Sequence, residues 1–219
     1  WQAWKQNIFP DQILEHGGLL CVGYKWQHED KPHVLSDWDH GHEEMVRRTH
    51  ELLCEADGVV TYNGDKYDIP KLTGECVRAN LPPPPPATSI DLIKTVKKFG
   101  LFMNRLGFVG PLLGLGGKLE HEGINLWKKV DDGDKDAQAR MTDYCAQDVL
   151  LTEDLYDRVM PYIRNHPRLM ITEKDQCPCC HKKQTQRRGY RYTRCFKIQR
   201  VQCTNCGHWF DTTRQKISA

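Results

Sequence analysis

The stretch VVTYNGDKYDIPKL, residues 59–72, decides how this chain folds. Its first four residues are apolar or β-branched, which predicts a short buried strand over residues 59–62. Asn63-Gly64 is a turn signal, and apolar residues then recur at helical spacing from Asp68 to Ala79. A strand that turns directly into a helix predicts an α/β fold.

The segments before this stretch fit the same fold class. Residues 17–26 and 33–38 predict two strands of an antiparallel hairpin, because each is a short apolar run bounded by polar residues. Ser36 or Asp37 is placed to cap a helix that runs from Glu43 to Ala56.

The segments after it complete the order. Prolines 82–86 predict a stiff, extended connector, and residues 88–92 predict a strand. Short helical fragments follow to Leu115, residues 118–134 read as a polar loop, and a long helix then spans about 136–163. This order predicts a mixed sheet, with an antiparallel edge joined to parallel crossings.

Charge is distributed unevenly along the 219 residues. Residues 171–219 hold 11 Lys and Arg against 3 Asp and Glu, whereas residues 1–170 hold 20 against 26.

No apolar run approaches the roughly 18 residues that a membrane span needs, and no charged-then-apolar leader opens the chain. We therefore expect a protein of the cytoplasm or another reducing compartment, with no secretion signal and no membrane partner.

Six of the ten cysteines lie within residues 177–206. Cys177 and Cys180 form one C-x2-C knuckle, Cys203 and Cys206 form another, and 22 residues separate them. This spacing resembles a zinc ribbon, in which each knuckle offers two thiolates to a tetrahedral Zn²⁺. Two alternatives stay open: Cys179 or His181 takes the place of one of these four ligands, or the cysteines form disulfides. The spare candidates are Cys179, His181 and Cys195.

The insert between the knuckles combines positive charge with aromatic rings, and residues 191–202 alternate as a strand does. This composition is typical of a surface that follows phosphates and stacks on bases. The alternative is a solvated basic face on a ribbon that docks to protein. We expect Trp209 and Phe210 to lie in the ribbon core. The candidate nucleic-acid contacts are Arg188, Tyr190, Arg191, Tyr192 and Arg194.

A second candidate site combines a phenol with carboxylates. The stretch YCAQD, residues 144–148, lies in the long helix, so Tyr144 and Asp148 share one face. Asp68 follows a strand end, where sites of α/β sheets collect. Paired carboxylates suit Mg²⁺ or Mn²⁺, although each aspartate alone also fits a helix cap or a solvated side chain.

These motifs carry a family resemblance. Residues 59–72 resemble the second exonuclease motif of family B DNA polymerases, N-x-x-x-(F/Y)-D, and YCAQD resembles the third, Y-x-x-x-D. With SIDLIK, residues 89–94, between them, the pattern is similar to the DEDDy branch of the DnaQ-like 3'→5' exonucleases. The resemblance covers about residues 17–163. It implies a ribonuclease-H-like three-layer fold for residues 1–168. The change in charge and the cysteine cluster then mark the zinc ribbon over residues 169–219.

The resemblance also implies chemistry. It makes Asp68 and Asp148 ligands of a two-metal Mg²⁺ or Mn²⁺ site that hydrolyses phosphodiesters at a 3' end, with single-stranded DNA as the expected substrate. Tyr144 would orient the attacking water, and Asn63 would contact the terminal nucleotide or brace its loop. Asp91 would contact the site or cap the next helix. A polymerase or replication protein would be a separate chain.

The sequence departs from the family at the first motif, D-x-E, which it lacks. Asp37 and Asp39 stand one residue apart, but they follow the hairpin instead of preceding it. Since the sequence also opens on Trp1 instead of Met, we expect residues upstream to supply D-x-E, and these 219 residues to cleave little alone. Two alternatives remain: a non-catalytic nucleic-acid-binding or adaptor protein on a decayed nuclease fold, and an endonuclease on the same fold.

Overall fold

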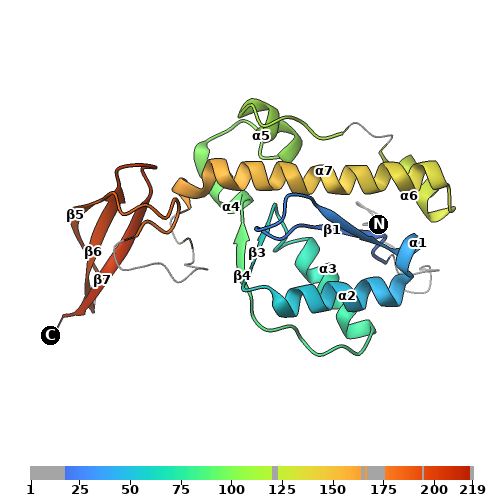
Figure 1. Cartoon of the computed structure of the whole chain (residues 1–219), viewed down its shortest axis with the longest axis horizontal. Helices are drawn as coiled ribbons and strands as arrows, with labels where there is room; N and C mark the ends of the chain where they lie inside the picture. The colour runs from blue at the N-terminus through green and yellow to red at the C-terminus, as the bar shows by residue number, and fades with distance from the viewer. Residues whose placement is uncertain (1–17, 120–122, 164–165, 167–175, 194, 218–219) are drawn as a thin grey trace, which may run out of the picture. The chain divides into compact units, whose positions relative to one another are not determined.

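The computed structural model describes residues 18–119, 123–163, 166, 176–193 and 195–217 (Figure 1). The chain divides into two compact units. The first contains the described parts of Trp1–Cys54, Lys66–Pro85 and Leu119–Val149, and the second contains those of Glu55–Asp65, Pro86–Lys118 and Leu150–Ala219. Each unit is described by itself below.

The first unit begins with an antiparallel hairpin. Strands β1 (Cys21–Tyr24) and β2 (His33–Ser36) pair with Cys21 opposite Ser36 and Tyr24 opposite His33. The helices of this unit are α1 (Asp37–His40), α2 (His42–Glu55), α3 (Asp68–Arg78), α6 (Ile124–Asp131) and the residues of α7 (Lys135–Val159) up to Val149.

Strand β1 lies directly against α7 in this unit. The sulfurs of Cys21 and Cys145 are 3.2 Å apart. A Cβ added at Gly23 would stand 3.0 Å from Cγ2 of Val149 and 3.1 Å from the carbonyl oxygen of Cys145. Glycine at position 23 therefore lets the strand approach the helix backbone closely.

The core of the first unit lies where α6 meets α7. Leu126 and Val130 of α6 and Ala137 and Met141 of α7 are buried together. The two α6 residues are four positions apart and so lie on the same face of the helix. Their burial, with Trp127 packed beside them, holds α6 against α7.

The second unit contains a parallel pair of strands. β3 (Gly58–Thr61) and β4 (Thr88–Asp91) run side by side with Thr61 opposite Asp91. The core beside them includes Leu92, Val109 and Leu151, each fully buried. The other elements packed in this unit are α4 (Ile93–Val96), η2 (Lys97–Phe99), α5 (Leu106–Leu112), the end of α7 and η3 (Met160–Tyr162).

The last three strands form an antiparallel ribbon, drawn in red in Figure 1, in the order β5-β6-β7. These strands are β5 (Thr185–Tyr192), β6 (Phe196–Cys203) and β7 (Trp209–Lys216). His208, between β6 and β7, is only 2% exposed, and its Nδ1 lies 3.0 Å from the carbonyl oxygen of Pro161. Burial lowers the pKa of this imidazole, so the neutral form is favoured at this contact.

Most elements confirm the sequence predictions. The hairpin, the helices α2 and α3, the strands β3 and β4 and the long α7 all occur within a few residues of their expected positions. None of the described helices is both long enough and apolar enough to cross a bilayer.

Four expectations are wrong. Residues 118–134 include the helix α6, which two buried side chains stabilise, instead of a loop throughout. Residues 191–202 do not form one strand, because a turn after Tyr192 divides them between β5 and β6. Trp209 is 39% exposed, since it alternates with the buried Phe210 along β7. In the described part of the chain, the hairpin and the parallel pair are separate two-stranded sheets, not one mixed sheet.

Candidate functional site

The loop between β3 and α3 is held by one buried carboxylate. Asp91 is 7% exposed, and its Oδ1 accepts the backbone N–H of Asn63 at 2.6 Å and that of Ile93 at 3.3 Å. Its Oδ2 accepts the N–H of Asp65 at 3.4 Å. Since buried backbone donors need partners, Asp91 fixes the turn that presents Asn63.

Backbone conformation adds to this constraint. Asn63 has φ 66°, a left-handed conformation that asparagine tolerates better than most residues. At Gly64 an added Cβ would stand 2.5 Å from the Thr61 side chain, so only glycine fits there. The Asn-Gly pair that served as a turn signal is thus required by the geometry of this loop.

Asp65, in the same loop, is engaged in polar contacts. Its carboxylate accepts hydrogen bonds from Lys94 and from the hydroxyl of Ser89. These hydrogen bonds, from Lys94 first and Ser89 second, lower its pKa. Asp65 therefore ties the loop to β4 and α4.

Asp68 is the first residue of α3 and is exposed. The residue before it, Tyr67, is 42% exposed, with Nζ of Lys66 5.4 Å from its ring centroid. Asp68 is therefore a solvent-accessible carboxyl group at the start of α3.

Tyr144 and Asp148 lie one turn apart on α7, in the same unit as Asp68. Tyr144 is half-buried against the α6–α7 core, with its ring 6.2 Å from that of Trp127 in an edge-to-face contact. Asp148 is half-buried, and its Oδ1 is shielded from solvent. The packing of β1 against Cys145 and Val149 fixes this turn of α7.

Asp68 and Asp148 are of the right ligand type for Mg²⁺ or Mn²⁺, but they do not complete a site. Over the described residues, only one group of three or more Cys, His, Asp or Glu side chains could hold a metal ion together, and it contains neither aspartate. Asp39 lies in the helix α1 and accepts a hydrogen bond from Ser36 Oγ at 2.6 Å, which gives it a local structural role.

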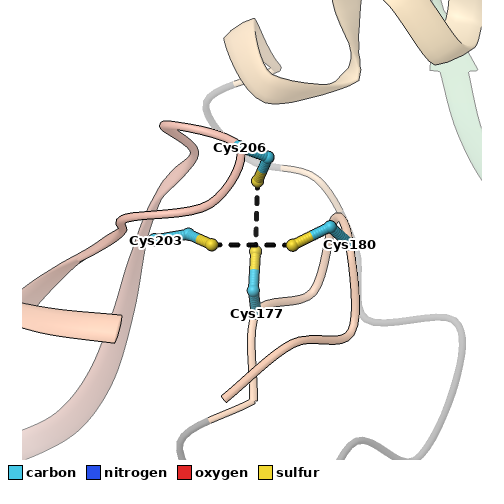
Figure 2. Close-up of side chains that lie close together, drawn as sticks. All are labelled: Cys177, Cys180, Cys203 and Cys206. Carbon is cyan, nitrogen blue, oxygen red and sulfur yellow. Dashed lines mark hydrogen bonds between the residues drawn. The ribbon is translucent and has the colours of Figure 1, made fainter. Parts of the chain in front are cut away.

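The group of possible ligands consists of the four cysteines of the two knuckles (Figure 2). All four sulfurs lie within 4.8 Å of one another, with 3.6 Å between Cys177 and Cys206 and 3.5 Å between Cys180 and Cys203. A tetrahedral zinc ion with bonds of about 2.3 Å needs sulfurs about 3.8 Å apart. The arrangement fits Zn²⁺.

The surroundings of these thiols shift their pKa values in opposite directions. Burial raises the pKa of Cys177 to about 12, against the effect of backbone N–H groups that point at its sulfur. Burial also opposes ionisation of Cys180, but hydrogen bonds, the largest from the Lys182 N–H, bring its pKa down to about 7. The spare residues Cys179, His181 and Cys195 are outside the group, and the last two are exposed.

The candidate nucleic-acid contacts do not share one surface. Arg191 bonds to Asp211 on β7, whereas its strand neighbours Tyr190 and Tyr192 point to the opposite face, because side chains alternate along a strand. Tyr190 and Tyr192 are 51% and 66% exposed, with Nζ of Lys197 4.1 Å from the Tyr190 ring centroid. Arg194 lies outside the described residues.

Sequence reasoning gave only part of the role of two residues. Asp91 was expected to contact the site or cap the next helix; it accepts the N–H of Ile93 at the start of α4, and its bonds to Asn63 and Asp65 follow from the pairing of β3 with β4. The exposed position of Trp209 could be found from the alternation Trp-Phe-Asp, which places Phe210 alone on the core side.

A search of curated proteins finds no match. A model of the family described as the RNase_H superfamily matches residues 15–160, which include β1 to β4, the loop held by Asp91 and the turn of α7 that carries Tyr144 and Asp148. The chain belongs to the RNase_H superfamily.

Proposed function

We propose that this chain is a metal-dependent 3'→5' exonuclease that hydrolyses single-stranded DNA from its end. The observation that carries the proposal is one unit that contains Asp68, the first residue of α3, together with Tyr144 and Asp148, which lie one turn apart on α7. Members of the superfamily are commonly nucleases, and this pair of motifs resembles that of the DEDDy exonucleases.

In this proposal each residue has a distinct task. Asp68 and Asp148 supply carboxylate ligands for Mg²⁺ or Mn²⁺. A divalent metal pair bound there would generate the attacking hydroxide and stabilise the leaving 3' oxygen. The Tyr144 hydroxyl orients the attacking water. Asn63, whose backbone N–H is held by Asp91, braces its loop.

The proposal requires two further carboxylates. The printed sequence contains no D-x-E, so we propose that this pair comes from a segment outside these 219 residues. The described residues accordingly provide two aspartates of a four-carboxylate site, and we expect the printed chain alone to cleave little.

The four-cysteine group has a structural function in this proposal. Its core is small and consists of Cys177, Val201, Cys203 and Phe210, with partly buried cysteines around them. A domain with so little apolar burial usually needs a metal for its stability. Zn²⁺ held by the four thiolates would therefore contribute most of the ribbon's folding free energy, and the ribbon assists nucleic-acid binding.

The direction and mode of cleavage can be tested with three substrates. Full-length protein and Mn²⁺ are incubated with a 5'-labelled single strand, the same strand with a 3' label, and a circular single strand. The exonuclease reading predicts a ladder of shortened 5'-labelled products, immediate release of a labelled mononucleotide from the 3' end, and an intact circle. Cleavage of the circle would establish the endonuclease alternative instead, and an RNA strand of equal sequence separates the two nucleic acids.

The incomplete carboxylate set favours a second candidate, a non-catalytic nucleic-acid-binding adaptor. It predicts that full-length protein binds the single strand and leaves all three substrates intact with Mg²⁺ or Mn²⁺. A D-x-E strand encoded in frame before Trp1 would argue against it.

A further inference from the structure

One face of the ribbon sheet combines arginines with an exposed tryptophan. Strand register places Trp209 opposite Gln202 and Asp211 opposite Arg200, so these four side chains lie on the same face. The pair beside them, Val201 and Phe210, points to the other side and is buried with the metal-binding cysteines. The exposed face is therefore rigidly backed by the ribbon core.

The arginines on this face are arranged around aromatic rings. The guanidinium carbon of Arg200 lies 4.8 Å from the Trp209 ring centroid, and that of Arg214 lies 3.6 Å from the Phe196 centroid. Nε of Arg188 donates to Gln202 Oε1 at 3.1 Å, which places Arg188 on the same face. We call this surface the arginine face: Arg188, Arg191, Arg200, Arg214 and Trp209.

The charge of the face identifies its partner as an anion. All four arginines are exposed, and from Gln176 to Ile217 the sequence has a single acidic residue, Asp211. Arginine offers several donors to phosphate oxygens, and cations on a strand-shaped surface match the phosphates of a nucleic-acid backbone. Electrostatic attraction alone, however, does not distinguish a single strand from a duplex.

The aromatic ring makes that distinction. Trp209 is 39% exposed although it is large and apolar, and Arg200 leaves part of its surface open to a partner. An exposed indole can stack on an unpaired base, whereas the faces of paired bases are covered by their neighbours in a duplex. The surface thus fits a strand whose bases are free.

We propose that the arginine face binds a single-stranded nucleic acid, with a base stacked on Trp209 and the backbone phosphates bound by the arginines. This rests on the proposed function, because the bound strand would be the one whose end is cleaved. Asp211 limits the affinity: its Oδ2 accepts hydrogen bonds from Nη2 of Arg191 at 2.6 Å and from Nε at 3.0 Å, so one arginine is neutralised in the free protein.

Binding is measured by fluorescence anisotropy of a labelled 20-nucleotide oligothymidylate with full-length protein carrying Asp148→Ala, so that no cleavage occurs. Trp209→Ala should weaken binding about 10-fold, since one base–aromatic stack is lost, and Trp209→Phe should restore most of the affinity. Asp211→Asn should tighten binding several-fold by releasing Arg191. Arg187→Ala is the matched control, because Arg187 lies opposite Val201 on the other face and is also exposed.

The outcomes separate this inference from the proposed function. Zinc content of one ion per chain verifies that each variant is folded. The inference is overturned if the protein binds a duplex as tightly as the single strand, or if polyglutamate competes fully. It is also overturned if Arg187→Ala and Trp209→Ala weaken binding equally, or if Asp211→Asn leaves the affinity unchanged. If binding is as stated but the unsubstituted protein never cleaves, only the exonuclease proposal is overturned. Protein that cleaves but is insensitive to Trp209→Ala overturns only the arginine face.

Discussion

Asp91 shows how one buried carboxylate can determine the geometry of a loop. It accepts backbone hydrogen bonds from Asn63, Asp65 and Ile93 while only 7% of it is exposed. Asp91→Ala should lower the free energy of unfolding by about 1–3 kcal/mol, because it leaves buried N–H groups without their acceptor. Urea denaturation of the full chain measures this effect.

The matched control for Asp91 is Asp154→Ala, at an exposed position of α7. We expect that substitution to stay within about 0.5 kcal/mol of the unsubstituted protein, as surface changes usually do. Equal effects of the two substitutions would mean that the loop does not depend on Asp91.

At the scale of elements, the packing of β1 on α7 positions the turn that carries Tyr144 and Asp148. Gly23→Ala would bring a methyl group to 3.0 Å from Val149 and 3.1 Å from the backbone of Cys145. We expect a loss of about 1–3 kcal/mol, since overpacking forces strand and helix apart. Thermal unfolding monitored by circular dichroism measures the loss.

Gly74→Ala is the control for this test, because it should change the stability of the protein in the opposite direction. Gly74 lies inside α3, and an added Cβ there would meet no atom within 4 Å. Alanine should therefore stabilise the protein by about 0.5–1 kcal/mol through helix propensity. If both substitutions stabilised it, the close approach of β1 to α7 would be disproved.

The three strands of the ribbon should lose their structure together when the metal is removed. With a strong chelator, backbone amides of residues 185–216 should lose protection from hydrogen exchange, because the small core around Cys177 and Phe210 cannot hold three strands alone. Amides of residues 135–149 in α7 should be unaffected. Cys203→Ser should have the effect of the chelator, whereas Cys195→Ser, at an exposed cysteine outside the group, should keep the metal.

The elements that sequence predicted correctly are those with strong local signals. A β-branched run gave β3, helical spacing gave α3 and α7, and the two C-x2-C knuckles gave the four clustered cysteines. Helix α6 was missed because it is only eight residues long and stands in a polar segment, residues 118–134, so its apolar residues gave too short a periodic pattern. Short helices of this kind owe their stability to tertiary packing, which local pattern does not reveal.

At the scale of the whole molecule, the order of helices and strands along the chain predicted the fold class, but it did not predict how the strands pair into sheets. The expected mixed sheet is represented, within the described residues, by the separate pairs β1-β2 and β3-β4. Hydrogen bonding between strands is non-local, so composition and periodicity cannot specify which edges meet. For the same reason, which side chains of β6 lie beside those of β7 follows only from the register of the two strands.

One measurement tests directly whether the turn of α7 that ends at Asp148 forms part of a hydrolytic metal site. The measurement is the rate of Mn²⁺-dependent mononucleotide release from a 3'-labelled single strand by full-length protein, with Asp148→Asn compared with Asp143→Asn. Asp143 is an exposed carboxylate on the same helix. The account predicts at least a ~10²-fold loss for Asp148→Asn, because the carboxylate that positions the metal is removed, and little change for Asp143→Asn. Equal rates for the two variants, with both proteins folded, would contradict it.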